Sequence, residues 1–307
     1  MSSRTPEKPT IGILYDRIRW EEKEIARRLD ERGANVQMID GKLQVLSLNS
    51  QGDSIPQVVI ERCVSFYRGL NIASVFEGQG ARTINSAKIL DICGNKLATS
   101  LLLTRHGVPS PRTVVAFSAE SALQAVETMG YPCVMKPIVG SWGRQVVPVR
   151  DRETAEALIE LREQQGDSIQ SIFYIQEMIN RPPRDIRCIT VGNRIVASVY
   201  RYAPPDTWKT NVALGGHTEP CPLTKELEDI VLNTSRIIGM GVLGVDVMER
   251  QGTGEFLVHE VNGTVEFKGA QASTLESIAD QIAGYAISVE KDGLFTDKPI
   301  PEIETRS

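Results

Sequence analysis

The fold is decided by two stretches of sequence, GVDVM at residues 244–248 and FLVHEVNGTVEFK at residues 256–268. Both are apolar runs of strand length, and the GTG sequence at 252–254 between them is typical of a turn, so the pattern predicts a β-hairpin. Each predicted strand also carries an acid where a buried strand favours a hydrocarbon side chain, Asp246 in the first and Glu260 in the second.

Asn262 follows Glu260 by two residues, and both side chains therefore project from the same face of the second strand. With Asp246 on the neighbouring strand, three oxygen-bearing side chains converge, which suits a hard cation such as Mg²⁺. A pair of solvated acids on an edge hairpin gives the same pattern, and these residues alone leave both interpretations open.

The composition is that of an ordinary soluble globular protein. The 307 residues suffice for two or three modules with cores of their own, and the net charge of -5 argues against a binder of nucleic acid or anionic membrane. No apolar run reaches membrane-spanning length, and residues 1–10 do not resemble a signal peptide, so we expect a cytoplasmic protein. Scattered cysteines without a CxxC pair disfavour disulfides and structural zinc; they are Cys63, Cys93, Cys133, Cys188 and Cys221.

The N-terminal part alternates between strand and helix signals. Apolar runs at 11–15, 36–39 and 58–60 predict strands, and the periodic segments 20–32 and 70–76 predict helices between and after them. This alternation indicates a small parallel sheet. Because no GxGxxG sequence follows the first strand, a dinucleotide-binding fold is not supported.

The middle of the chain predicts a second module. Residues 85–106 have a helical pattern that is interrupted at Gly94-Asn95 and contains Lys96, and a strand at 134–137 contains Lys136. The loop GSWGR at 140–144 follows that strand directly. Its small residues expose backbone N–H groups that suit phosphates, although a plain hairpin loop gives the same pattern.

The C-terminal part predicts further strands and helices. Strands are expected at 172–179 and 194–202, and a strand beginning at Asp185 places that side chain and Arg187 on one face. Arg187 offers a fork suited to phosphate or carboxylate, whereas a surface ion pair between the two residues is the simpler alternative. Amphipathic helices are predicted over 223–240 and 272–289.

The polar motifs occur in a fixed order over nearly the whole chain: Lys96, Lys136-Pro137, residues 140–144, Gln176-Glu177, Asp185-Ile186-Arg187, Lys209-Thr210-Asn211, Asp246 and Glu260-Val261-Asn262. That ordered set resembles the ATP-grasp ligases, and within them the RimK-like group. The closer resemblance is to LysX-type enzymes, which join α-aminoadipate or glutamate to the C-terminal glutamate of the small acidic carrier LysW. It rests on residues 13–19, 61–65, 140–144, 173–177, 221–224 and 266–268.

The resemblance implies an ATP-grasp fold of the α/β (α+β) class. It divides the chain into an N-terminal small parallel α/β domain (residues 1–88), a central small domain (89–170) and a C-terminal antiparallel-sheet domain (171–292), with a polar tail at 293–307. A homodimer or homotetramer is expected by the same resemblance.

The resemblance also implies a site for ATP and two Mg²⁺ ions. Lysines would contact the phosphates, the 140–144 loop would close over them, residues 176–179 would read the adenine and Asp185 the ribose. This nucleotide-binding set is Lys96, Lys136, Gly140, Ser141, Trp142, Gly143, Arg144, Gln176, Glu177, Met178, Ile179, Asp185 and Lys209. Asp246, Glu260 and Asn262 would hold the metal ions, and Arg187 and Asn211 would lie at the γ-phosphate and acyl phosphate as catalytic residues.

The implied chemistry explains this choice of residue types. A carboxylate is a poor electrophile, so the ligase phosphorylates it with ATP, and an amine then attacks the acyl phosphate to give an amide, ADP and phosphate. Such phosphoryl transfer depends on positioning and charge neutralisation, which metals, lysines and arginines supply. A nucleophilic side chain is not required.

The substrate carboxylates call for basic side chains, for which Arg187, Arg201 and Lys268 are candidates, with plain surface charges as the alternative. The segment Glu266-Phe267-Lys268 is expected to determine the amino acid that is bound. In LysX-type sequences for α-aminoadipate it continues with Asn-Ser, whereas this chain continues with Gly269-Ala270. Both α-aminoadipate and glutamate therefore remain open as substrates, in lysine-type or arginine-type biosynthesis.

An acidic LysW-type carrier would be steered by positive charge, and the docking candidates are Arg17, Arg19, Arg62 and Arg68. A solvated face explains these arginines as well. Two other functions stay open: a RimK-like ligase that adds glutamate to another protein's C-terminus, and a catalytically silent regulator that binds ATP. The three candidate metal ligands argue against the silent regulator.

Overall fold

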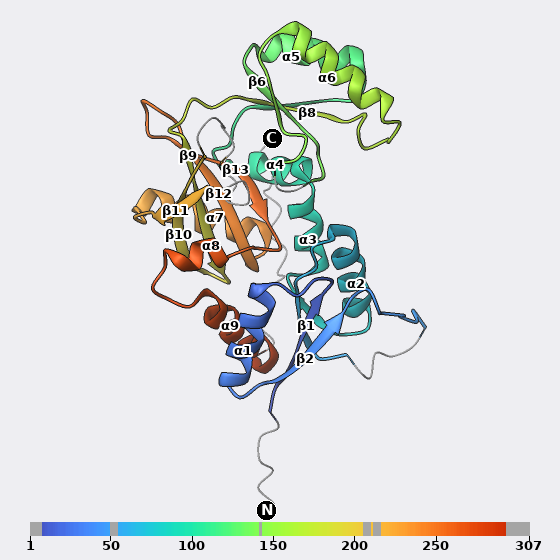
Figure 1. Ribbon diagram of the computed structural model, residues 1–307, viewed down its shortest axis with the longest axis vertical. Helices are drawn as coiled ribbons and strands as arrows, with labels where there is room; N and C mark the ends of the chain where they lie inside the picture. The colour runs from blue at the N-terminus through green and yellow to red at the C-terminus, as the bar shows by residue number, and fades with distance from the viewer. Residues whose placement is uncertain (1–7, 50–54, 141–142, 205–209, 211–215, 293–307) are drawn as a thin grey trace, which may run out of the picture.

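The computed structural model describes residues 8–49, 55–140, 143–204, 210 and 216–292 (Figure 1). Its three sheets lie one above another in Figure 1, with the N-terminal sheet at the bottom, a five-stranded sheet in the middle and a small antiparallel sheet at the top. Within the described ranges, every helix is too short or too polar to span a bilayer.

The N-terminal sheet is parallel, with strand order β2-β1-β3-β4, as the βα alternation predicts. Its elements are β1 (Thr10–Tyr15), α1 (Trp20–Glu31), β2 (Asn35–Asp40), β3 (Val58–Glu61), α2 (Phe66–Gly78) and β4 (Arg82–Ile84). Strand β3 is buried along its whole length, which explains its continuous apolar run. The sequence does not predict β4, because three residues are too few for a periodic signal.

The small antiparallel sheet has strand order β5-β8-β6-β7. This part of the chain contains α3 (Ala87–Gly94), α4 (Lys96–Arg105), β5 (Thr113–Ala116), α5 (Ala119–Met129), β6 (Cys133–Lys136), β7 (Val147–Val149), α6 (Arg152–Gln164) and β8 (Phe173–Glu177). Because β8 pairs with both β5 and β6, this sheet continues past residue 170. We therefore propose that the central domain ends after Glu177.

The predicted helix break at residues 94 and 95 is confirmed, and the two residues have different roles. A Cβ on Gly94 would lie 1.9 Å from the Phe66 ring, so a larger residue does not fit. Asn95 caps α4, since its side chain accepts hydrogen bonds from the backbone N–H groups of Leu97 at 3.0 Å and Ala98 at 3.2 Å. The cap places Lys96 in the first turn of α4.

The five-stranded sheet is antiparallel, with strand order β11-β10-β9-β12-β13. Its elements are β9 (Arg184–Val191), β10 (Arg194–Tyr202), β11 (His217–Pro220), α7 (Lys225–Ile238), β12 (Val242–Glu249) and β13 (Phe256–Asn262), followed by α8 (Lys268–Ala272) and α9 (Ile278–Asp292). Strands β12 and β13 form the predicted hairpin. Gly252 and Gly254 in its turn have φ values of +92° and +73°, which favour glycine.

One face of β9 explains how a functional site forms on this sheet. Side chains at alternate positions share a face, so Asp185, Arg187, Ile189 and Val191 all project to the same side. Ile189 and Val191 belong to a core shared with α1 and α9, which buries that end of the face. The charged pair lies at the other end of the strand, beyond α9.

Two predicted element boundaries are wrong. Residues 263–267 do not continue the strand, because β13 ends at Asn262 and the chain enters α8 at Lys268. The last helix does not begin at Ala272, which ends α8; α9 starts at Ile278, and Ser277 accepts a hydrogen bond from the backbone N–H of Asp280 at 3.2 Å. Polar contacts accompany both boundaries, local at Ser277 and with the distant Glu61 and Arg19 in the 263–267 segment, and an apolar pattern does not reveal them.

Candidate functional site

The predicted site residues form a row across the five-stranded sheet. The strand register pairs Arg201 of β10 with Asp185 of β9, Arg187 of β9 with Asp246 of β12, and Asp246 with Glu260 of β13. The first two pairs join opposite charges, whereas Asp246 and Glu260 are two acids on neighbouring strands. Cross-strand neighbours of opposite charge attract, and like charges repel, so the two acids need cations from elsewhere in the site.

Asp246 lies at the centre of this network and is buried. Its carboxylate accepts two hydrogen bonds from Arg187, from Nε and, at 2.8 Å, from Nη2. Arg201 Nη2 lies 3.1 Å from Oδ2 of the same carboxylate. Two guanidinium groups therefore neutralise the buried acid, as a buried charge requires.

Glu260 joins the site from the last strand and meets a cation from another element. Its Oε1 lies 3.3 Å from Nζ of Lys96, which also donates a 2.8 Å hydrogen bond to the carbonyl of Gly140. Burial acts to raise the pKa of Glu260, but Lys96, His259 and Lys136 outweigh it and lower the pKa to about 2. The carboxylate is thus ionised at neutral pH.

Lys136 approaches the site from the small antiparallel sheet. Its Nζ donates a 2.6 Å hydrogen bond to Oε1 of Gln176, whose amide group in turn donates to Thr113 and Tyr174, each at 3.0 Å. Burial lowers the pKa of Lys136 to about 8 despite the attraction of Glu260. The hydrogen bond of the ammonium group is to a neutral amide, which leaves its charge available for an anion.

Asp185 is buried and enclosed by donors. Arg201 forms two hydrogen bonds with it, Nε at 2.8 Å and Nη2 at 2.7 Å, and the Thr210 hydroxyl donates a third. Burial acts to raise the pKa of Asp185, but Arg201 and His259 hold it well below its usual value. Arg201, a predicted substrate residue, consequently forms ion pairs with Asp185 and Asp246 in this structure.

The three candidate metal ligands fit a hard cation. Asn262 Nδ2 lies 3.4 Å from Oδ2 of Asp246, so the asparagine meets the acid of the neighbouring strand. Two carboxylates and one amide oxygen are the donor types that Mg²⁺ takes from proteins. The described residues contain no cluster of three or more acidic, histidine or cysteine side chains that could hold a metal ion. The present set has only two acids, and its third member is an asparagine.

The predicted adenine-reading residues lie at the end of β8 and beyond it. Glu177 accepts hydrogen bonds from the backbone of Arg112 at 2.9 Å and from Arg250 at 3.2 Å. Ile179 is buried and Met178 partly so. Of the 140–144 loop, Gly140, Gly143 and Arg144 are described and Ser141 and Trp142 are not; Lys209 and Asn211 also lie outside the described residues.

The predicted substrate segment is attached to the N-terminal module. Glu266 accepts a 3.0 Å hydrogen bond from Arg19, and the backbone N–H of Lys268 donates to Glu21 at 3.2 Å. Phe267 is fully buried and packs edge-on against Trp20, with ring centroids 5.7 Å apart. Its ring therefore belongs to the core and is not placed to touch a substrate.

The prediction that Arg62 docks a carrier on the surface is wrong. Its side chain is 3% exposed, and its Nε donates to the fully buried Glu22 at 3.1 Å. The guanidinium also lies over the Phe267 ring, 5.9 Å from the centroid. Arg62 therefore supports the core beneath the 263–268 segment.

The sequence analysis missed His259, and a β-bulge is the reason. Asp246 pairs with Glu260 but the next residue, Val247, pairs with Val258, so His259 is an extra residue in β13. A bulge turns two consecutive side chains toward the same side, whereas strict alternation places His259 opposite Glu260. His259 Nε2 consequently lies 3.8 Å from Oδ2 of Asp185. No sequence pattern marks this bulge.

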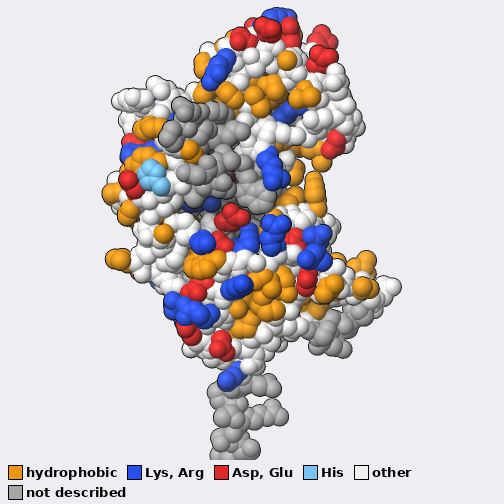
Figure 2. All heavy atoms as spheres, viewed as in Figure 1, with side chains coloured by type: hydrophobic (Ala, Val, Ile, Leu, Met, Phe, Trp, Pro, Cys, Tyr) orange, Lys and Arg blue, Asp and Glu red, His pale blue; other side chains and the backbone are white. Residues whose placement is uncertain are grey.

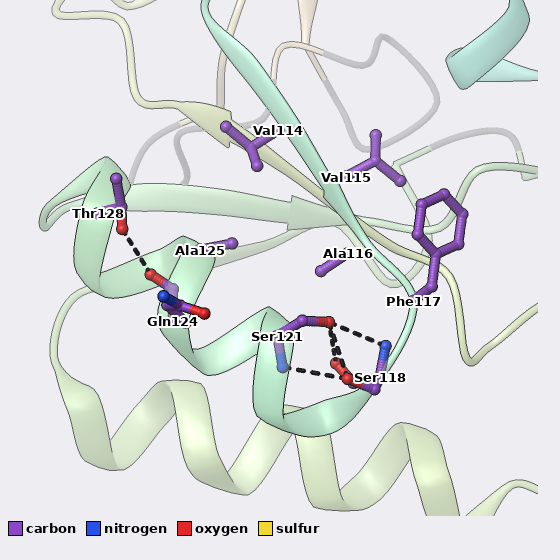
Figure 3. Close-up of a pocket in the computed structure, with 9 residues that line it drawn as sticks. All are labelled: Val114, Val115, Ala116, Phe117, Ser118, Ser121, Gln124, Ala125 and Thr128. Atoms are coloured by element: carbon purple, nitrogen blue, oxygen red, sulfur yellow. Dashed lines mark hydrogen bonds between the residues drawn. The ribbon is translucent and has the colours of Figure 1, made fainter.

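Charged side chains gather on the face of the molecule that Figure 2 shows. Figure 2 shows Lys, Arg, Asp and Glu side chains gathered in a band across the middle of the molecule, beside the residues drawn in grey. A separate groove of about 440 Å³ lies between β5 and α5, lined by Val114, Phe117 and Gln124 among others (Figure 3). It contains none of the predicted site residues.

Comparison with known proteins identifies the two parts of the chain. Residues 93–286 match the RimK-like ATP-grasp domain, and residues 11–92 match the LysX preATP-grasp domain. The chain is 35% identical to a glutamate–LysW ligase ArgX from Sulfolobus acidocaldarius, over 90% of this chain and 97% of that one. It is 38% identical to an α-aminoadipate–LysW ligase LysX from Sulfurisphaera tokodaii, over 84% and 91%.

Solved structures show the same fold. A RimK domain ATP-grasp protein from Sphaerobacter thermophilus gives a TM-score of 0.73 at 21% identity, covering 90% of this chain and 98% of that chain. A D-alanine–D-alanine ligase from Bacillus anthracis in complex with ATP gives 0.67 at 17% identity, covering 94% and 99%. The chain therefore belongs to the RimK-like ATP-grasp family and is an ATP-dependent ligase that forms carbon–nitrogen bonds.

Proposed function

We propose that this protein joins the α-amino group of α-aminoadipate or glutamate to the C-terminal glutamate of an acidic, LysW-type carrier protein. The observation that carries the proposal is the meeting of Lys96, Lys136 and Arg187 with the acids Asp246 and Glu260. Such an arrangement offers cations to a triphosphate and carboxylates to the metal that accompanies it. Similarity to LysW ligases over most of the chain supports the choice of acceptor.

The proposed roles follow from the charge of each group. Lys96 and Lys136 bind phosphate oxygens, and the 140–144 loop covers them. Asp246, Glu260 and Asn262 hold two Mg²⁺ ions, whose chemistry is to neutralise charge on the phosphates. Arg187 is bound to Asp246 in this structure, so it stands beside the metal ligands and is placed to steady the transferred phosphoryl group together with Asn211.

The reaction needs positioning more than a reactive side chain. The terminal phosphoryl group passes from ATP to the carrier carboxylate, which forms an acyl phosphate and leaves ADP. The neutral amine of the amino acid then attacks the acyl carbon, phosphate departs, and the amine loses a proton. The buried, paired charges of the sheet are fixed before the reaction, so they stabilise developing charge with little reorganisation.

A mass-shift assay tests this function directly. The carrier is incubated with enzyme, ATP, Mg²⁺ and an equimolar mixture of glutamate and α-aminoadipate. We expect the carrier to gain one amino-acid residue, with one ADP released per product, and the mass of the adduct identifies the preferred substrate. A protein that binds ATP normally but releases no ADP with carrier and either amino acid contradicts the proposal.

A further inference from the structure

His259 carries an unsatisfied polar atom inside the site. Its side chain is 10% exposed, yet Nε2 is buried without a hydrogen-bond partner, since the nearest carboxylate oxygen, Oδ2 of Asp185, is 3.8 Å away. Buried side-chain nitrogens in folded proteins nearly always have a partner, and an orphan of this kind calls for an explanation. No role in the proposed chemistry uses this imidazole.

The pairing of β12 with β13 fixes the position of His259. The bulge in β13 adds it to the face that carries Glu260 and Asp246, and strand pairing fixes the backbone on both sides of it. The imidazole lies next to Asp185, the residue expected at the ribose. Asp185 itself already accepts three hydrogen bonds, two from Arg201 and one from Thr210.

We propose that His259 binds a ribose hydroxyl of the nucleotide through Nε2, and that Asp185 keeps the neighbouring Arg201 and Thr210 side chains in place. The inference rests on the proposed binding of ATP. A ribose hydroxyl both donates and accepts hydrogen bonds, so it satisfies Nε2 in either neutral tautomer of the imidazole. This contact gives Nε2 of His259 a hydrogen-bond partner and leaves the Asp185–Arg201 ion pair intact.

Direct nucleotide binding tests this role without turnover. Dissociation constants of ATP, 2′-deoxy-ATP and 3′-deoxy-ATP are measured by calorimetry for the wild type, His259→Phe and His259→Gln. In the wild type we expect at least one deoxy analogue to bind about tenfold more weakly than ATP, which corresponds to about 1.4 kcal/mol. His259→Phe should bind ATP about as weakly as that analogue and no longer distinguish the two, while His259→Gln retains part of the distinction.

His217→Phe is the matched control, because His217 lies on the same sheet but is largely exposed and stacks on Tyr202. It should bind all three nucleotides as the wild type does. Equal binding of ATP and both analogues by the wild type overturns the inference. So does an unchanged distinction in His259→Phe. A wild type that does not bind ATP at all contradicts the proposed function instead.

Discussion

Asp246 shows how one residue serves both stability and function. It is a predicted metal ligand, and in this structure its carboxylate neutralises Arg187 and Arg201. Removing the carboxylate takes the hydrogen-bonded acid from Arg187 and leaves Arg201 with Asp185 alone, and breaking a buried ion pair costs several kcal/mol. A cation and a nucleotide that bind here must therefore share these partners with the protein.

We predict that Asp246→Asn raises the Mg²⁺ concentration needed for half-maximal ligation and lowers turnover by about 10²-fold or more, because the amide keeps the shape but loses the charge. Titration of activity with Mg²⁺, alongside circular dichroism, measures both effects. Glu249→Gln is the control: it removes an acid from the same strand, where Glu249 pairs with Arg184 at 3.2 Å. Equal Mg²⁺ dependence in the two variants would count against the metal assignment.

We predict that nucleotide binding depends on pH, because the pKa of Lys136 lies near neutrality. Burial lowers its pKa to about 8, and the protonated form is the one that attracts phosphate. As the pH rises through 8 the ammonium loses its proton, so ATP affinity should fall, by about tenfold at pH 9 if this charge is essential to binding. The dissociation constant of ATP measured from pH 7 to 9 reports the change.

Lys136→Arg provides the comparison, because a guanidinium stays protonated throughout this range. Its ATP affinity should vary little between pH 7 and 9, even if the absolute value is weaker. A wild type and a Lys136→Arg variant with the same pH profile would show that another group titrates.

At the scale of elements, Asn85 fixes the ends of the β12–β13 hairpin. Its Oδ1 accepts a 2.6 Å hydrogen bond from the backbone N–H of Val242, where β12 begins, and its amide donates to the carbonyls of Val242 and Gly263, at 2.8 and 2.5 Å. Gly263 directly follows the end of β13. A Cβ on Gly241 would lie 1.8 Å from Oδ1 of Asn85, so the contact also requires that glycine.

We predict that Asn85→Ala lowers the free energy of unfolding by about 3 kcal/mol, since three hydrogen bonds are lost and buried backbone groups are left unpaired. Urea unfolding measures the loss. The control is Asn71→Ala on α2, where an exposed asparagine donates to the Tyr67 carbonyl at 2.7 Å and should contribute little. Similar urea midpoints for the two variants would mean that Asn85 does not fix the hairpin.

At the scale of the whole molecule, the N-terminal module holds the 263–268 segment in place. Thr264 donates to the buried Glu61 at 2.9 Å, and Arg19 pairs with Glu266 at 3.0 Å. The C-terminal helix α9 packs against α1, so the two ends of the described chain share one core (Figure 1). The position of this segment therefore depends on residues more than 200 positions away in sequence.

We predict that Arg19→Ala and Glu266→Ala each raise KM for the amino acid severalfold while KM for ATP stays unchanged, because either change frees the segment from the N-terminal module. The double variant should behave like either single variant, since residues in contact are not additive. Arg27→Ala, which removes an exposed arginine paired within α1, is the control. Additive effects of Arg19 and Glu266 would refute the proposed attachment.

The sequence by itself determined the alternation of strands and helices in the N-terminal sheet, the β12–β13 hairpin and the spacing that puts Glu260 and Asn262 on one face, because these features depend on local periodicity and turn residues. It also identified the family, through motifs in a fixed order. Only the tertiary structure decided which charges meet. The pairing of Asp246 with Arg187 and Arg201, the burial of Arg62 and the bulge that exposes His259 to the site arise from strand register and domain packing, which no local pattern encodes.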